Sequence, residues 1–153
     1  MHAVIEQTIK PFRGKNATLK VVIPDIGPEI VVPRAVMHFI SPLVENSLEA
    51  IAARGALRKQ PAITIEVKLL SQHDGLSIIV ADEGEGWTCP VDRLSQSIRS
   101  GHRFSTKGKS RGYGLGNVSR LTAKLGGLLL LSKNHPTGAI VEIRLPRRIV
   151  CPT

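Results

Sequence analysis

Three short motifs hold the residues of this chain that are best suited to chemistry. Asn46 lies within SPLVENSLEA at 41–50, Asp82 begins DEGEG at 82–86, and three glycines alternate in RGYGLGN at 111–117. An amide oxygen can bind a hard cation, a buried carboxylate can accept a hydrogen bond, and a glycine-rich turn before a helix can present backbone N–H groups to an anion. Together the three motifs predict a nucleotide pocket.

The carboxylate of Asp82 is predicted to point inward, because it continues the alternating apolar row of residues 76–80. Burying a carboxylate is costly unless a donor meets it. The exocyclic amine of adenine is such a donor, and a hydrogen bond to a charged acceptor contributes roughly 1.5–3 kcal/mol. Gly84 and Gly86 would let a flat base lie against the backbone. An Asp that caps a tight turn after a strand remains the simpler interpretation of this motif alone.

Asn46 and the glycines of 111–117 are weaker signals when each is taken alone. Asn46 lies at the edge of the apolar stripe of a predicted helix, where its oxygen suits Mg²⁺, an ion that uses water and phosphates for its other ligands. A helix-flank Asn bonded to water is the alternative. The glycine turn opens a second predicted helix, and Lys107 upstream could reach the same phosphates as a point charge.

The surrounding pattern predicts a two-layer α/β (α+β) sandwich with a mixed, mostly antiparallel sheet and helices on one face. Apolar residues alternate with polar ones in several segments, which implies that one face of the sheet is only partly covered. Residues 88–113 form a long connection rich in Gly, Ser and basic residues, and we interpret it as a lid over a single domain, 1–153. Strands are predicted at about 19–23, 63–69, 76–80, 128–132 and 141–145, and helices at about 3–12, 34–54 and 115–125.

Composition and charge narrow the function classes. The chain has 153 residues, of which 42% are hydrophobic and 22% charged, as in an ordinary globular domain. The net charge of +9 raises the question of nucleic acid, but the scarce aromatic residues do not interleave with the basic ones as a stacking surface requires. Basic residues concentrate in 93–111, which favours a segment that holds phosphates, with a solvated charged loop as the alternative. No apolar run is long enough for a membrane span.

In the order of its motifs the chain resembles the GHKL (Bergerat-fold) superfamily, which includes DNA gyrase, heat-shock chaperone ATPases, histidine kinases and mismatch-repair ATPases. Within it, HRFSTKGKSRGYGLGNVSRLTAKLGGLLLLS followed by TGAIVEIRLP is most similar to the catalytic ATP-binding domain of bacterial sensor histidine kinases. The resemblance implies ATP and Mg²⁺ as cofactors, Asn46 as the Mg²⁺ ligand and Asp82 as the adenine acceptor. It also implies further nucleotide-binding residues: Gly84, Gly86, Phe104, Lys107, Gly112, Gly114, Leu115 and Gly116.

One residue departs from the family pattern. Typical kinases carry an oxygen-bearing side chain four residues before the N-box Asn, and hydrolysing relatives carry Glu there, whereas this chain has Pro42. Glu45 is nearly a third of a turn away from Asn46 and cannot simply replace that group. The departure disfavours water activation, which needs a group to orient the nucleophile. Pro42 is also expected to bend the helix, or to start a fresh one at Ser41-Pro42.

The leading hypothesis is therefore the ATP-binding catalytic domain of a two-component sensor histidine kinase, with no catalytic base assigned. It would donate the γ-phosphoryl group to a histidine on a separate dimerisation domain, in cis if the chain is a fragment, with a response regulator downstream. Neither nucleic acid nor membrane contact is expected. The location is cytoplasmic, alone or as part of a membrane-anchored sensor. A stand-alone serine kinase of the anti-sigma-factor type and a gyrase-like or mismatch-repair-like ATPase module remain alternatives.

Overall fold

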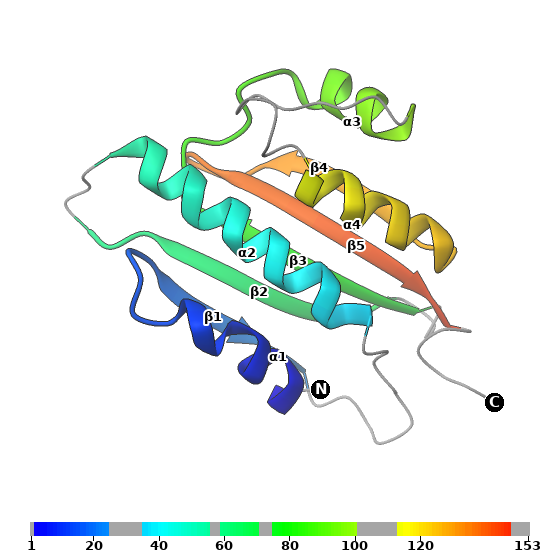
Figure 1. Ribbon diagram of the computed structural model, residues 1–153, viewed down its shortest axis with the longest axis horizontal. Coiled ribbons are helices and arrows are strands. Elements are labelled where there is room, and N and C mark those ends of the chain that lie inside the picture. Colours follow the sequence, from blue (N-terminus) through cyan, green and yellow to red (C-terminus); the bar gives the residue numbers. More distant parts are fainter. Residues whose placement is uncertain (1, 25–34, 56–58, 71–74, 101–112, 148–153) are drawn as a thin grey trace.

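A computed structural model of the chain describes residues 2–24, 35–55, 59–70, 75–100 and 113–147. In these residues one sheet of five strands carries helices on one of its faces (Figure 1). The helices are α1 (His2–Ile9), the short 3-10 helix η1 (Lys10–Phe12), α2 (Ala35–Arg54), α3 (Val91–Arg99) and α4 (Tyr113–Lys124). The strands are β1 (Thr18–Val22), β2 (Ala62–Leu69), β3 (Gly75–Asp82), β4 (Leu128–Lys133) and β5 (Ala139–Pro146).

The sheet has the strand order β1-β2-β3-β5-β4. The edge strand β1 is parallel to β2, and the other three neighbouring pairs are antiparallel. The predicted fold class, a mixed and mostly antiparallel sheet with helices on one face, is confirmed. Asp82 ends β3 opposite Ile63 of β2, so the carboxylate occupies the last position of a row of core residues.

The core lies between the sheet and the helix layer, because each strand turns alternate side chains toward the helices. Helix α2 packs between α1 and α4 in that layer (Figure 1). The helix and the sheet contribute the largest fully buried side chains, which include Phe39, Ile40, Val44, Ile63, Ile65, Leu76, Ile78 and Ile143. Aromatic residues are scarce, so aliphatic packing fixes the position of α2 over β3.

The predicted lid is not a loop throughout, because α3 lies inside it. The helix begins after Pro90, and its apolar residues Val91, Leu94 and Ile98 recur at helical spacing within a polar sequence. Leu94 is buried, which ties this helix to the body of the domain. The sequence pattern predicted no helix within 88–113, so α3 was missed.

Two expectations about the helices also need correction. Helix α2 continues through Pro42 without interruption, so the alternative prediction that a new helix starts at Ser41-Pro42 is wrong. Pro42 has no N–H to donate to the preceding turn, but packing of α2 on both sides holds the helix together. Helix α4 begins at Tyr113, two residues earlier than the predicted start near Leu115, so Gly114 lies in its first turn and not before it.

Candidate functional site

The carboxylate of Asp82 is buried at the end of β3, and its donors among the described residues come from three parts of the chain. Its Oδ1 accepts hydrogen bonds from the backbone N–H groups of Gly84 (2.9 Å) and Ala139 (3.2 Å). Its Oδ2 accepts a hydrogen bond from the hydroxyl of Ser47 on α2, at 3.1 Å. These donors stabilise an ionised carboxylate in an apolar setting and fix its orientation.

The glycine turn after Asp82 lies directly on α2. A Cβ added at Gly84 would be 2.7 Å from the Cβ of Ala50 and 2.9 Å from the nitrogen of Ile51, so only glycine fits. The next residue, Glu85, donates its N–H to the carbonyl of Ala50 at 3.1 Å. The turn is thereby pinned to the same helix that supplies Ser47.

Gly86 completes this turn with a positive φ of 82°, a conformation that favours glycine. It lies close to Gly138, in the turn that leads into β5. That turn is also tied to β3, because the side-chain amide of Asn134 donates to the carbonyl oxygen of Asp82 at 2.8 Å. Two turns from distant parts of the sequence therefore surround the carboxylate of Asp82.

Asn46 lies on α2, half-buried, and faces the start of α4. A Cβ added at Gly114 would be 3.3 Å from Asn46 Nδ2 and 3.5 Å from its Oδ1. The same point is 3.7 Å from the Cβ of Pro42, one turn earlier on α2. The absence of a side chain at Gly114 therefore leaves room beside the amide of Asn46.

The structure thus brings together two groups of the residues singled out by the sequence, Asn46 with Gly114 and Asp82 with Gly84 and Gly86, and both groups lie against α2. Leu115 packs against the core, as a helix anchor would, and Gly116 has no atom within 4 Å of an added Cβ. Phe104, Lys107 and Gly112 lie outside the described residues. Their predicted roles remain predictions.

Sequence reasoning missed Ser47, Ala139 and Asn134, which hold Asp82 or its backbone. Ser47 follows the predicted metal ligand directly, so its place in the motif was a usable signal. The other two contacts depend on how β5 lies beside β3, and no local pattern reveals that.

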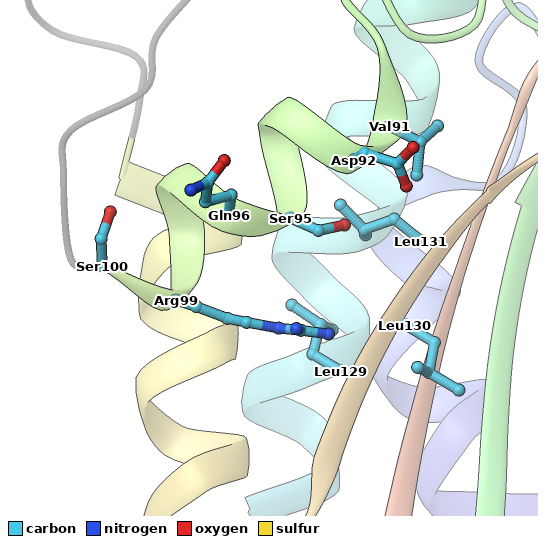
Figure 2. A pocket seen from close by; sticks show the side chains of 9 residues that line it. All are labelled: Val91, Asp92, Ser95, Gln96, Arg99, Ser100, Leu129, Leu130 and Leu131. Carbon is cyan, nitrogen blue, oxygen red and sulfur yellow. The ribbon is translucent and has the colours of Figure 1, made fainter.

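A hollow of about 680 Å³ between α3 and β4 lies apart from this site (Figure 2). One face of α3 and the edge strand line it through Val91, Asp92, Ser95, Gln96, Arg99, Ser100, Leu129, Leu130 and Leu131. Figure 2 shows the side chain of Arg99 extending from α3 toward Leu129 of β4. Of the predicted nucleotide-binding residues that the structure describes, none lines this hollow, so it is not the candidate site.

The chain belongs to the family described as histidine kinase-, DNA gyrase B-, and HSP90-like ATPase, which it matches over residues 31–149. Among curated proteins it is similar to the sensor protein CitS of Bacillus subtilis, with 32% identity over 108 residues. It is also 29% identical over 102 residues to a putative sensor histidine kinase, NtrY-like, of Rickettsia felis. The alignments cover 71% and 67% of this chain but only 18% and 15% of those proteins, so the chain spans less than a fifth of their length.

Solved structures of sensor kinases share the fold. The mycobacterial sensor histidine kinase MprB matches all of this chain and 96% of its own, with a TM-score of 0.71 and 16% identity. The catalytic domain of histidine kinase ThkA, in a nucleotide-free form, matches 95% of this chain and 93% of its own, with a TM-score of 0.69 and 20% identity. Full-length ShkA in complex with AMPPNP matches 99% of this chain and 30% of its own, with a TM-score of 0.72 and 18% identity.

The family match and the shared fold confirm the fold and the resemblance predicted from the sequence, including the similarity to catalytic domains of sensor histidine kinases. Among the residues that the structure describes, no helix combines the length and the apolar character that a membrane crossing requires.

Proposed function

We propose that this domain binds ATP with Mg²⁺ and donates the γ-phosphoryl group to a histidine on a separate dimerisation domain, in the cytoplasm, with a response regulator as the later acceptor. One observation carries the proposal: the buried carboxylate of Asp82 is held beside a glycine turn that only glycine can form against α2. A carboxylate held in this way suits the exocyclic amine of adenine, which is a hydrogen-bond donor.

Asn46 is the residue proposed to hold Mg²⁺. Its amide oxygen is a hard, neutral donor, and the space that Gly114 leaves beside it fits a cation that keeps several waters and binds phosphate oxygens. When bound, Mg²⁺ would neutralise charge on the phosphates. The start of α4 would supply backbone N–H groups for the same phosphates through Gly114, Leu115 and Gly116, and Gly112 is proposed to join them. Lys107 and Phe104 are proposed to contribute a charge and a cover from the lid.

Pro42 supports phosphoryl transfer to a partner over steady hydrolysis. It occupies the position one turn before Asn46 and faces Gly114, so it lies where a water-orienting group would be needed. A proline side chain cannot orient or deprotonate water. Glu45, the nearest carboxylate in the sequence, is exposed. Catalysis here would therefore consist of positioning and charge stabilisation, and the acceptor histidine would supply the nucleophile.

Asp82→Asn tests the adenine contact. The asparagine oxygen can still accept from Gly84 and Ala139, and its amide can bond with the hydroxyl of Ser47, so the fold should persist. The amide N–H₂ would then meet another donor, the adenine amine. We expect the Kd for Mg-ATP to rise about 10- to 150-fold, the equivalent of roughly 1.5–3 kcal/mol. Isothermal titration calorimetry measures this change.

Glu83→Gln is the matched control, because Glu83 is the exposed neighbour whose carboxylate accepts from the N–H of Ala62 at 2.9 Å. It should leave the affinity for ATP unchanged. If Asp82→Asn binds ATP as tightly as the parent, the pocket assignment is wrong. A second assay supplies a histidine-bearing dimerisation domain and labelled ATP: acid-labile phosphate on that domain supports the transfer. Acid-stable phosphoserine on a cell-extract protein, or hydrolysis stimulated by DNA, would favour one of the alternatives.

A further inference from the structure

Ser47 forms its hydrogen bond outside its own helix. Hydroxyls in the interior of a helix commonly bond back to the carbonyl four residues earlier. Thr8 and Thr122 do so in this chain, with distances of 2.8 and 2.7 Å to the carbonyls of Val4 and Val118. Ser47 instead donates across the helix–sheet boundary to Oδ2 of Asp82.

The bond is enclosed by the core. Ser47 is 4% exposed and Asp82 is 5% exposed, so water cannot readily replace either partner. In a setting of low dielectric, a hydrogen bond to a charged acceptor is stronger than at the surface, and its loss is costly. The Ser47 hydroxyl, on α2, donates to Oδ2 of Asp82. The backbone N–H groups of Gly84 and Ala139 donate to the other oxygen, Oδ1.

We propose that Ser47 is a positioning residue of the base pocket, which sets the preference of the site for an adenine amine. This inference rests on the proposed function. By fixing Oδ2, Ser47 prevents rotation of the carboxylate about its Cβ–Cγ bond, so the carboxylate is already aligned for a donor in the plane of the base. Preorganisation of this kind saves the free energy of ordering when the ligand binds.

The rival explanation is that Ser47 only satisfies a buried carboxylate for the sake of stability. The two explanations differ in which ligands they affect. A structural role would weaken the binding of every nucleotide alike, or none. A positioning role acts through the amine, so it would change the preference for ATP over purine riboside triphosphate, which lacks that amine.

The experiment measures the Kd of both triphosphates, with Mg²⁺, for the parent and for Ser47→Ala. The parent should prefer ATP, and Ser47→Ala should reduce the ratio of the two Kd values by a few-fold to about tenfold, the range of one hydrogen bond. Ser47→Thr, which keeps the hydroxyl, should restore most of the preference. Thr122→Val removes a hydroxyl that is equally buried but bonded within α4, and it should leave the ratio unchanged.

Equal weakening of both triphosphates in Ser47→Ala, or no change in either, would overturn the positioning role while leaving ATP binding intact. If the parent itself does not prefer ATP over purine riboside triphosphate, the proposed adenine contact fails, and this inference fails with it. Should Ser47→Ala not fold, the ratio measured for Ser47→Thr decides: retention of the parent's preference supports the inference, and loss of the preference with the hydroxyl present refutes it.

Discussion

Gly84→Ala is the substitution for which the structure predicts the clearest loss of stability. The added methyl would lie 2.7 Å from the Cβ of Ala50 and 2.8 Å from its carbonyl carbon. These atoms are backbone and Cβ atoms of α2, so no side-chain rotation can move them away. The helix itself is held between α1 and α4. The turn after β3 must therefore move off the helix.

The size of the effect follows from what that movement breaks. Overpacking alone costs about 1–3 kcal/mol. The shift also strains two hydrogen bonds, from Gly84 N–H to Asp82 at 2.9 Å and from Glu85 N–H to Ala50 at 3.1 Å, each worth about 1 kcal/mol. We expect a loss of about 3 kcal/mol in the free energy of unfolding, which lowers the Tm by about 6–12 °C in a domain of this size.

Gly116→Ala is the matched control, because the same change there meets nothing within 4 Å. Gly116 lies within α4, where alanine is favoured over glycine by about 0.5–1 kcal/mol, so this variant should be slightly more stable than the parent. Urea unfolding followed by circular dichroism, without nucleotide, compares the three proteins. A Gly84→Ala protein as stable as the parent, or equal losses in both variants, would refute the packing argument.

Two further predictions concern the stability of the fold without nucleotide. Among the described residues the buried hydroxyl of Thr137 has no hydrogen-bond partner, so Thr137→Val should leave the Tm unchanged or raise it slightly, and a fall of several degrees would show that the hydroxyl is satisfied. The pKa of Glu142 is lowered, chiefly by the hydrogen bond from Arg144 at 2.7 Å. The ionised Glu142 therefore stabilises the fold fully above the ordinary glutamate pKa of about 4.3, and this stabilisation is lost as the pH falls through the lower pKa of the folded state. Arg144→Gln should therefore flatten the fall of the urea midpoint below about pH 4.3, and an unchanged pH profile would contradict the pairing.

The sheet was predictable because strand periodicity is a local property of the sequence. The alternation of apolar and polar residues predicted the ends of β2, β3 and β5 to within one or two residues. Asp82 follows Leu76, Ile78 and Val80 at the same two-residue spacing, which correctly placed it on the inner face of the sheet. The stripe of α2 was equally clear. Helix α3 was missed because its three apolar residues are few among basic and small ones, and composition suggested a loop.

The contacts that build the site were much less predictable. Ser47 and Asp82 are 35 positions apart, and Ala139 is 57 positions from Asp82. Which hydroxyl meets which carboxylate depends on how α2 lies across β3, and that depends on packing across the whole core. The glycines of 82–86 were recognised as permissive of a turn, but the reason that position 84 excludes any side chain is Ala50, on another element.

Helix α2 connects the two glycine motifs, because one row of its side chains lies against Gly84 and Gly114. Pro42, Asn46 and Ala50 are four residues apart and therefore form one ridge, about 12 Å long at 1.5 Å per residue. Pro42 and Asn46 face Gly114, and Ala50 faces Gly84. The ridge thus extends from the proposed phosphate end to the proposed base end. Because α2 remains one helix through Pro42, the proline removes a side chain that could orient water without changing the spacing between the two ends.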